Sequence, residues 1–252
     1  DVLNIPGFFT ENSEFLSCRG KFGIRMRPYV VVNVAMSADG KLSTHERRQV
    51  TISGSEDFAR VDQLKAGCDA VMVGIGTVLA DNPSLTVKSE ENRKSRLSRG
   101  TSLHPVRIVV DSHARTPPEA KILHKEEGKR IIAVAKRADG ERVAELRKHA
   151  TVIIAGDEKV DLAMMMEELG RMGIQRIMVE GGGTLIAGLT AAGLVDEITT
   201  FIGNIIIGGK DAPTLSDGPG FTSESEFPRL TLLDARKMES GILLHWKIDP
   251  KA

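Results

Sequence analysis

The chain has 252 residues, and its 34 basic side chains balance its 34 acidic ones. Because there is no net basic field, we do not expect a protein that binds nucleic acid or a membrane surface. The chain has two cysteines and six scattered histidines, and no apolar run reaches membrane-spanning length. A disulfide framework, a metal site and a transmembrane helix are therefore not predicted, and a cytoplasmic protein is expected.

The length and the apolar fraction of 41% suit one large α/β domain. Residues 1–28 lack periodicity, so we interpret them as a leader segment of uncertain order. We expect a single domain over residues 29–250.

From Tyr29 onward, apolar runs that indicate strands alternate with segments that indicate helices. The predicted strands are Tyr29–Met36, Ala70–Val73, Val106–Val110, Arg130–Ala135, Thr151–Ala155, Arg176–Val179 and Glu197–Ile202. The predicted helices are a segment that Ser53 or Ser55 caps and that ends at Ala66, a short turn from Gly74 to Asp81, Gly140–His149, Leu162–Met172 and Thr184–Ala192. Leu230–Lys237 and Gly241–Ile248 follow as a hairpin. This order predicts a central, mostly parallel sheet flanked by helices, with an antiparallel C-terminal hairpin.

A basic cluster and one cysteine are expected to have structural roles and not functional ones. The basic cluster Arg93, Lys94, Arg96 and Arg99 lies in the polar segment Ser89–Ser102, which we interpret as a solvated loop. Cys68 precedes an apolar run and has no basic partner that the sequence reveals, so core packing is its expected role.

Three predicted strand ends carry small or polar residues where a ligand would lie in an open α/β sheet. The most informative is Glu180, which is followed by Gly181–Gly183 and Thr184. Glycines let backbone N–H groups approach a ligand, and the start of the next helix favours an anion such as a phosphate. A tight turn beside a surface glutamate is the alternative. The other two strand ends are Ser37–Gly40 and Gly74–Thr77, with Asp81 one turn later.

None of these segments is specific by itself. The dinucleotide fingerprint lacks its third glycine, and neither a Walker phosphate loop nor a nucleophile elbow occurs. Thr77 could cap a helix or donate to a phosphate, and Asp81 could be only a turn residue. Lys65 and Lys88 adjoin these segments and could bind phosphate as point charges, although such lysines are usually solvated.

Four segments together resemble the riboflavin-biosynthesis reductases, which have a dihydrofolate-reductase-like fold. The segments are RPYVVVNVAMSADGKLST, DQLKAGCDAVMVGIGTVLADNPSLTV, PVRIVVDSHARTP and IMVEGGGTLIAGLTAAGLVDEITTFIGNIIIGGKDAPTL. They span roughly residues 28–248 in the family's order. The resemblance implies a homodimer that uses NADPH to reduce the ribosylamino side chain of a pyrimidine 5′-phosphate to ribitylamino.

The resemblance also implies roles for individual residues. NADPH contacts are implied at Ala35, Thr51, Thr77, Asp81, Ser112, Val160, Gly182, Gly183, Thr184 and Leu185. Substrate contacts are implied at Asn33, Gln49, Lys65, Leu85, Lys88 and Glu180. Glu180 and Asp39 are the candidate carboxylates for catalysis; we favour Glu180 as a substrate anchor and Asp39 as mainly a turn former.

The sequence identifies the family more closely than it identifies the substrate. No zinc-deaminase signature is found, so the free-standing reductase of archaea and fungi is expected, which acts on the 2,5-diamino-pyrimidinone. Asn33, where bacterial members have lysine, favours the same form. The alternatives are a reductase of the deaminated pyrimidine, a dihydrofolate reductase, and a nucleotide-binding regulator without catalysis.

Overall fold

The structure is a computed structural model, and it describes residues 27–48 and 50–249. The predicted leader therefore lies almost entirely outside the described residues, and so does Gln49.

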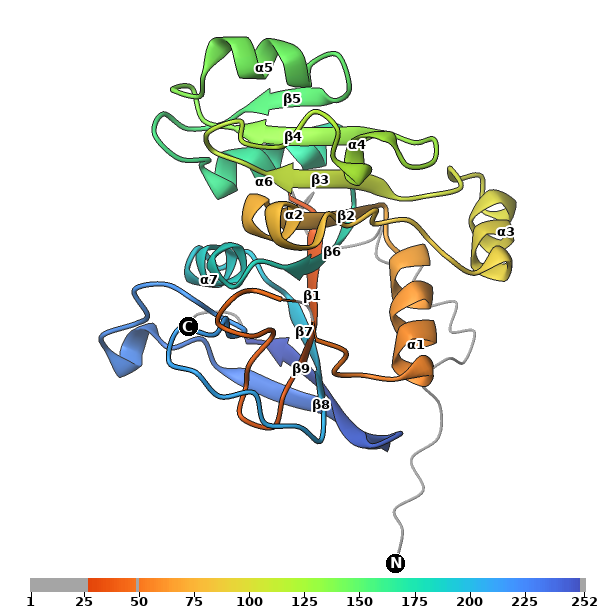
Figure 1. The fold of residues 1–252 in the computed structure, drawn as a ribbon, viewed down its shortest axis with the longest axis vertical. Coiled ribbons are helices and arrows are strands. Elements are labelled where there is room, and N and C mark those ends of the chain that lie inside the picture. Colours follow the sequence, from red (N-terminus) through yellow and green to blue (C-terminus); the bar gives the residue numbers. More distant parts are fainter. Residues whose placement is uncertain (1–26, 49, 250–252) are drawn as a thin grey trace, which may run out of the picture.

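One nine-stranded sheet runs through the described chain in the order β5-β4-β3-β2-β6-β1-β7-β9-β8 (Figure 1). Its strands are β1 (Tyr29–Met36), β2 (Ala70–Gly74), β3 (Val106–Val110), β4 (Arg130–Val134), β5 (Thr151–Ile154), β6 (Arg176–Gly181), β7 (Glu197–Ile202), β8 (Leu230–Met238) and β9 (Gly241–Ile248). All pairs from β5 to β7 are parallel, whereas β9 pairs antiparallel with both β7 and β8. The predicted mixed sheet with a C-terminal hairpin is confirmed.

Helices cover both faces of this sheet. They are α1 (Ser55–Ala66), α2 (Ile75–Asp81), α3 (Glu90–Ser98), α4 (Lys121–His124), α5 (Gly140–Leu146), α6 (Leu162–Arg171) and α7 (Gly183–Ala191), and a 3-10 turn, η2, spans Glu224–Glu226. Helices α6 and α7 pack on one face and α1, α2, α4 and α5 on the other. Strand β2 shows why both faces are apolar: Ala70 and Met72 join the first core, and Val71 and Val73 the second. No helix of residues 27–48 and 50–249 is long and apolar enough to cross a bilayer.

The start of α1 differs from the prediction that Ser53 or Ser55 caps it. Its N-cap is Gly54, without a side-chain cap. Instead Glu239, at the tip of the β8–β9 hairpin, accepts hydrogen bonds from the Glu56 backbone N–H (2.9 Å) and the Ser55 hydroxyl (3.3 Å). Figure 1 shows this hairpin tip beside the start of α1. The cap thus comes from a residue that is distant in sequence.

The prediction of a solvated loop over Ser89–Ser102 is wrong. Glu90–Ser98 forms α3, and the Arg96 side chain is buried. Its guanidinium donates to the Ala66 carbonyl (2.8 Å) and the Cys68 carbonyl (2.7 Å), so it closes the end of α1. Cys68 is buried as predicted, and burial raises the pKa of its thiol to about 11, which makes it unreactive.

Candidate active site

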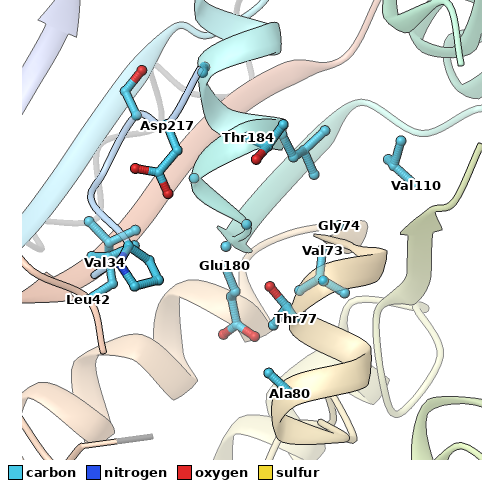
Figure 2. A pocket seen from close by; sticks show the side chains of 18 of the residues that line it. Val34, Leu42, Val73, Gly74, Thr77, Ala80, Val110, Glu180, Thr184 and Asp217 are labelled. Atoms are coloured by element: carbon cyan, nitrogen blue, oxygen red, sulfur yellow. The ribbon is translucent and has the colours of Figure 1, made fainter. Parts of the chain in front are cut away.

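A cavity of about 1250 Å³ lies at the carboxyl ends of the parallel strands. Because parallel strands end at the same edge of a sheet, the residues that follow β1, β2, β3 and β6 meet there. Figure 2 shows Glu180, Thr77, Thr184 and Asp217 around this space. Among the described residues, no group of His, Cys, Asp and Glu could hold a metal ion.

Two helices that begin at the cavity, α2 and α7, lack a side-chain cap. The N-caps of α2 and α7 are Gly74 and Gly182, and neither helix start has a side-chain hydrogen bond. Thr77 and Thr184 line the cavity from inside the first turns, so Thr77 does not cap α2, which the sequence had left open, and Thr184 does not cap α7. An uncapped helix start leaves backbone N–H groups for an anionic ligand.

Gly182 and Gly183 are required for different reasons. Gly182 has a φ of +85°, which an L side chain rarely adopts, whereas the atoms nearest to an added Cβ would lie at ordinary contact distances. Gly183 is crowded by the chain itself, because a Cβ there would lie 2.6 Å from the Thr214 carbonyl and would also collide with the Asp217 carboxylate. The Asp217 backbone N–H donates to the Gly183 carbonyl (3.1 Å). Gly183 therefore accommodates the segment 213–217 rather than a ligand alone.

Glu180 and Lys65 form an ion pair in this region. Lys65, in the last turn of α1, lies 2.8 Å from Glu180 Oε1, and the two side chains are only 11% and 17% exposed. Glu180 lines the cavity, but Lys65 does not. Lys65 therefore contacts the Glu180 carboxylate and not the cavity itself.

The cavity brings together most of the residues that the resemblance implied. It is lined by Asn33, Ala35, Thr51, Thr77, Asp81, Leu85, Ser112, Val160, Glu180, Gly182, Gly183, Thr184 and Leu185. Asp39, Lys65 and Lys88 do not line it, and Gln49 lies outside the described residues.

Asp39 is engaged in a turn outside the cavity. Its carboxylate accepts hydrogen bonds from the Ser37 hydroxyl (2.6 Å) and from the backbone N–H groups of Ile207 (3.0 Å) and Gly208 (2.8 Å). These donors, the Ser37 hydroxyl above all, lower the pKa of Asp39 to about 2. Asp39 therefore belongs to a turn and does not line the cavity.

Lys88 lies in a cationic region beside the cavity. Its ammonium donates to the hydroxyls of Ser84 (3.0 Å) and Thr86 (3.1 Å). Partial desolvation, and then the charges of Lys125 and Lys65, lower the pKa of Lys88. Asp62 fixes the segment, because its carboxylate accepts from the Lys88 backbone N–H (2.6 Å). A partly desolvated ammonium that two hydroxyls hold in place is suited to contact an anion.

A second basic group lines the cavity beyond β3 and β5. It comprises His113, Arg115 and Lys159, which sequence reasoning missed. The Ser112 hydroxyl accepts from the Val160 backbone N–H (3.0 Å), so the two loops that carry these side chains are joined. The sequence reasoning also missed the cavity-lining segment 216–221, although its Asp-Gly-Pro-Gly run is typical of an ordered turn.

The sequence matches known proteins over most of its length. Residues 28–244 match the RibD C-terminal domain family. The chain is 50% identical to the 2,5-diamino-6-ribosylamino-4(3H)-pyrimidinone 5′-phosphate reductase of Archaeoglobus fulgidus, over 81% of this chain and 93% of the relative. It is 45% identical to the protein of that name from Methanothermobacter thermautotrophicus, over 88% and 99%.

A solved structure agrees with these sequence matches. Acinetobacter baumannii RibD superimposes with a TM-score of 0.71 at 26% identity, over 89% of this chain and 59% of that chain. The chain thus spans about three fifths of that protein, and the predicted dihydrofolate-reductase-like fold is confirmed. The family match over nearly all of the described residues, together with the two relatives, shows that this chain belongs to the RibD C-terminal domain family.

Proposed function

We propose that this protein uses NADPH to reduce 2,5-diamino-6-ribosylamino-4(3H)-pyrimidinone 5′-phosphate to the ribitylamino compound in riboflavin biosynthesis, in the cytoplasm. The observation that carries the proposal is the cavity. An uncapped, glycine-started helix suited to a diphosphate lies there beside the partly buried carboxylate of Glu180, and Lys88 lies next to the cavity. Two relatives that the chain matches over most of their length carry the name of this activity.

The residues present fit the cofactor. Gly182, Gly183 and Thr184 at the start of α7, with Thr77 of α2, would hold its diphosphate, and Ser112 and Val160 would lie along its adenosine. Ala35, at the end of β1, would border the nicotinamide. When bound, NADPH supplies the hydride that reduces the open-chain C1′ of the sugar.

The remaining steps depend on the chain's own residues. Glu180, held by Lys65, accepts a hydrogen bond from an amino or hydroxyl group of the substrate and so places C1′. We also propose that this carboxyl group gives a proton to the ring oxygen of the sugar as the bond between C1′ and that oxygen breaks, and that it regains the proton from water. Lys88 binds the 5′-phosphate as a point charge.

The second basic group supports NADPH rather than NADH. His113, Arg115 and Lys159 line the cavity next to Ser112, where the adenosine ribose would lie, and a 2′-phosphate would neutralise them. We expect the double variant Arg115→Gln/Lys159→Gln to lose roughly 10-fold or more in NADPH affinity and to leave NADH affinity nearly unchanged. Fluorescence titration with both cofactors measures this; equal losses for the two would contradict the assignment.

The phosphate proposal predicts a selective effect at Lys88. We expect Lys88→Ala to raise KM for the phosphorylated pyrimidine, because the lost charge-assisted contact contributes about 1–3 kcal/mol to the binding free energy. The affinity for NADPH should not change. Lys88→Arg, which keeps the charge, is the matched control. Equal turnover of phosphorylated and dephosphorylated pyrimidine by the unaltered protein would refute a phosphate site.

We also propose a homodimer that forms through the sheet edge. β8 is the last strand of the sheet, and its Leu230, Leu232 and Leu233 are 43% to 48% exposed. An apolar edge strand of this kind is suited to pairing with a second copy. We expect Leu232→Lys/Leu233→Lys to convert a dimer into a monomer in light scattering. A monomeric unaltered protein would contradict the proposal.

A comparison of substrates tests the proposed function against its alternatives. NADPH oxidation should be followed with the diamino-pyrimidinone phosphate, with the deaminated uracil phosphate and with dihydrofolate. We expect the highest kcat/KM with the first. Preference for the second would identify the deaminated pyrimidine as substrate, and preference for dihydrofolate would identify a dihydrofolate reductase. NADPH binding without turnover of any of them would favour a regulator.

A further inference from the structure

A buried polar network fixes the orientation of one amide that lines the cavity. Asn33 lies in the middle of β1, is 7% exposed and lines the cavity. Its Oδ1 accepts hydrogen bonds from Arg60 Nη2 (2.7 Å) and from the Thr199 hydroxyl (2.8 Å). Thr199 is the residue opposite Asn33 on the neighbouring strand β7.

The chemistry of arginine settles which end of the amide points where. A guanidinium only donates, so the Asn33 atom that it contacts must be the carbonyl oxygen and not the amide nitrogen. The Nδ2 group therefore points away from Arg60 and Thr199. Among the described residues, none accepts a hydrogen bond from this nitrogen.

Arg60 is itself held in place by a second buried group. Its Nε donates to Asp57 Oδ1 (2.8 Å), and Nη2 lies 2.7 Å from the same oxygen. The Arg60 and Asp57 side chains are 12% and 3% exposed, and Arg60 does not line the cavity. A buried ion pair of this kind has one arrangement, because any rotation would leave a desolvated charge without its partner.

We infer that Arg60, fixed by Asp57, is a positioning residue that presents the Asn33 amide N–H as a hydrogen-bond donor to a ring carbonyl of the substrate pyrimidine. The inference rests on the proposed function and extends it. Asn33 then supplies the donor of the pyrimidine subsite and Glu180 supplies its acceptor. A site that offers one donor and one acceptor in fixed places selects a ring by its pattern of carbonyl and amino groups.

The test separates the direction of the Asn33 amide from its packing. Asn33→Asp keeps an oxygen for Arg60 and Thr199 but replaces the donor with an acceptor. We expect it to raise KM for the pyrimidine phosphate about 10-fold or more, with unchanged NADPH affinity. Arg60→Gln should raise the same KM, and Arg60→Lys should recover part of the loss because it keeps a charge for Asp57.

A second arginine provides the control for lost stability. Arg27 forms a comparable ion pair with Asp196, at 3.0 Å with side chains 18% and 12% exposed, and does not line the cavity. Arg27→Gln should lower the melting temperature without moving KM. If Arg60→Gln does not fold, the Asn33→Asp variant decides whether the amide N–H contacts the substrate, because it keeps the hydrogen bonds from Arg60 and Thr199.

The outcomes for this inference and for the proposed function are distinct. Calorimetric titration of the unaltered protein with the pyrimidine phosphate shows whether the substrate binds at all, and absence of binding and turnover would defeat the proposed function and this inference together. If the unaltered protein binds the pyrimidine and Asn33→Asp binds it equally well, only this inference fails. Loss of NADPH affinity in parallel with substrate affinity would also overturn it.

Discussion

Glu180→Gln should lower kcat/KM for the pyrimidine phosphate roughly 100-fold and leave most of the NADPH affinity intact. Glutamine keeps the size of the side chain but removes the charge and the capacity to exchange a proton. Glu180 lines the cavity, whereas its partner Lys65 does not, so the carboxylate is the member of the pair that a ligand can reach.

The ion pair makes a stability change part of this prediction. Lys65 is buried, so Glu180→Gln leaves an ammonium without its partner, and the melting temperature should fall. The double variant Lys65→Gln/Glu180→Gln removes both charges and should recover much of that stability without recovering turnover. Recovery of both would show that the pair only supports the fold. A stable, fully active Glu180→Gln protein would contradict the role of Glu180 as well.

Gly182→Val should weaken NADPH binding, by about 10- to 100-fold, because its φ of +85° disfavours any side chain and because the displaced backbone would no longer direct its N–H groups at the diphosphate. The control lies just beyond the other end of the same helix. Gly193 has a φ of +66°, has open space around it and does not line the cavity. Gly193→Val should therefore lower the melting temperature similarly but keep the NADPH affinity.

Gly183→Val is expected to act differently from Gly182→Val. It would push the segment 213–217 away from α7, so it should lower both stability and affinity. Wild-type NADPH affinity in a folded Gly182→Val protein would show that this turn does not hold the cofactor.

The parallel strands could be predicted from the sequence because each is an apolar run, and those inside the sheet are buried on both faces, whereas the edge strand β5 is partly exposed. Strand β2 and its neighbours carry valine, isoleucine and methionine on both sides, and short polar segments separate them from the helices. The helix caps could not be predicted in this way. The cap of α1 comes from Glu239. Arg96 is buried because carbonyls at the end of α1 accept hydrogen bonds from its guanidinium. Both depend on contacts between segments that are distant in the chain.

Some residues of the candidate site could likewise be predicted from the sequence, and others could not. Thr77 and Glu180, which lie next to strand ends and glycine turns, line the cavity, because the carboxyl ends of the parallel strands lie at one edge of the sheet. Arg60 and Asp217 are different, since one is an arginine on an ordinary helix and the other lies in a long connection without periodicity. Their significance arises from the side chains that they meet, Asn33 for Arg60 and Thr214 for Asp217.

The most direct test of the proposed function is to follow the hydride itself. The unaltered protein should be incubated with the diamino-pyrimidinone phosphate and with NADPH that carries deuterium at the transferring position of nicotinamide C4, and the product should be analysed by mass spectrometry and NMR. We predict a ribitylamino product with one deuterium, located at C1′. A product without deuterium, a label at another carbon, or no reduction of the side chain would contradict hydride transfer to the ribosylamino group in this cavity.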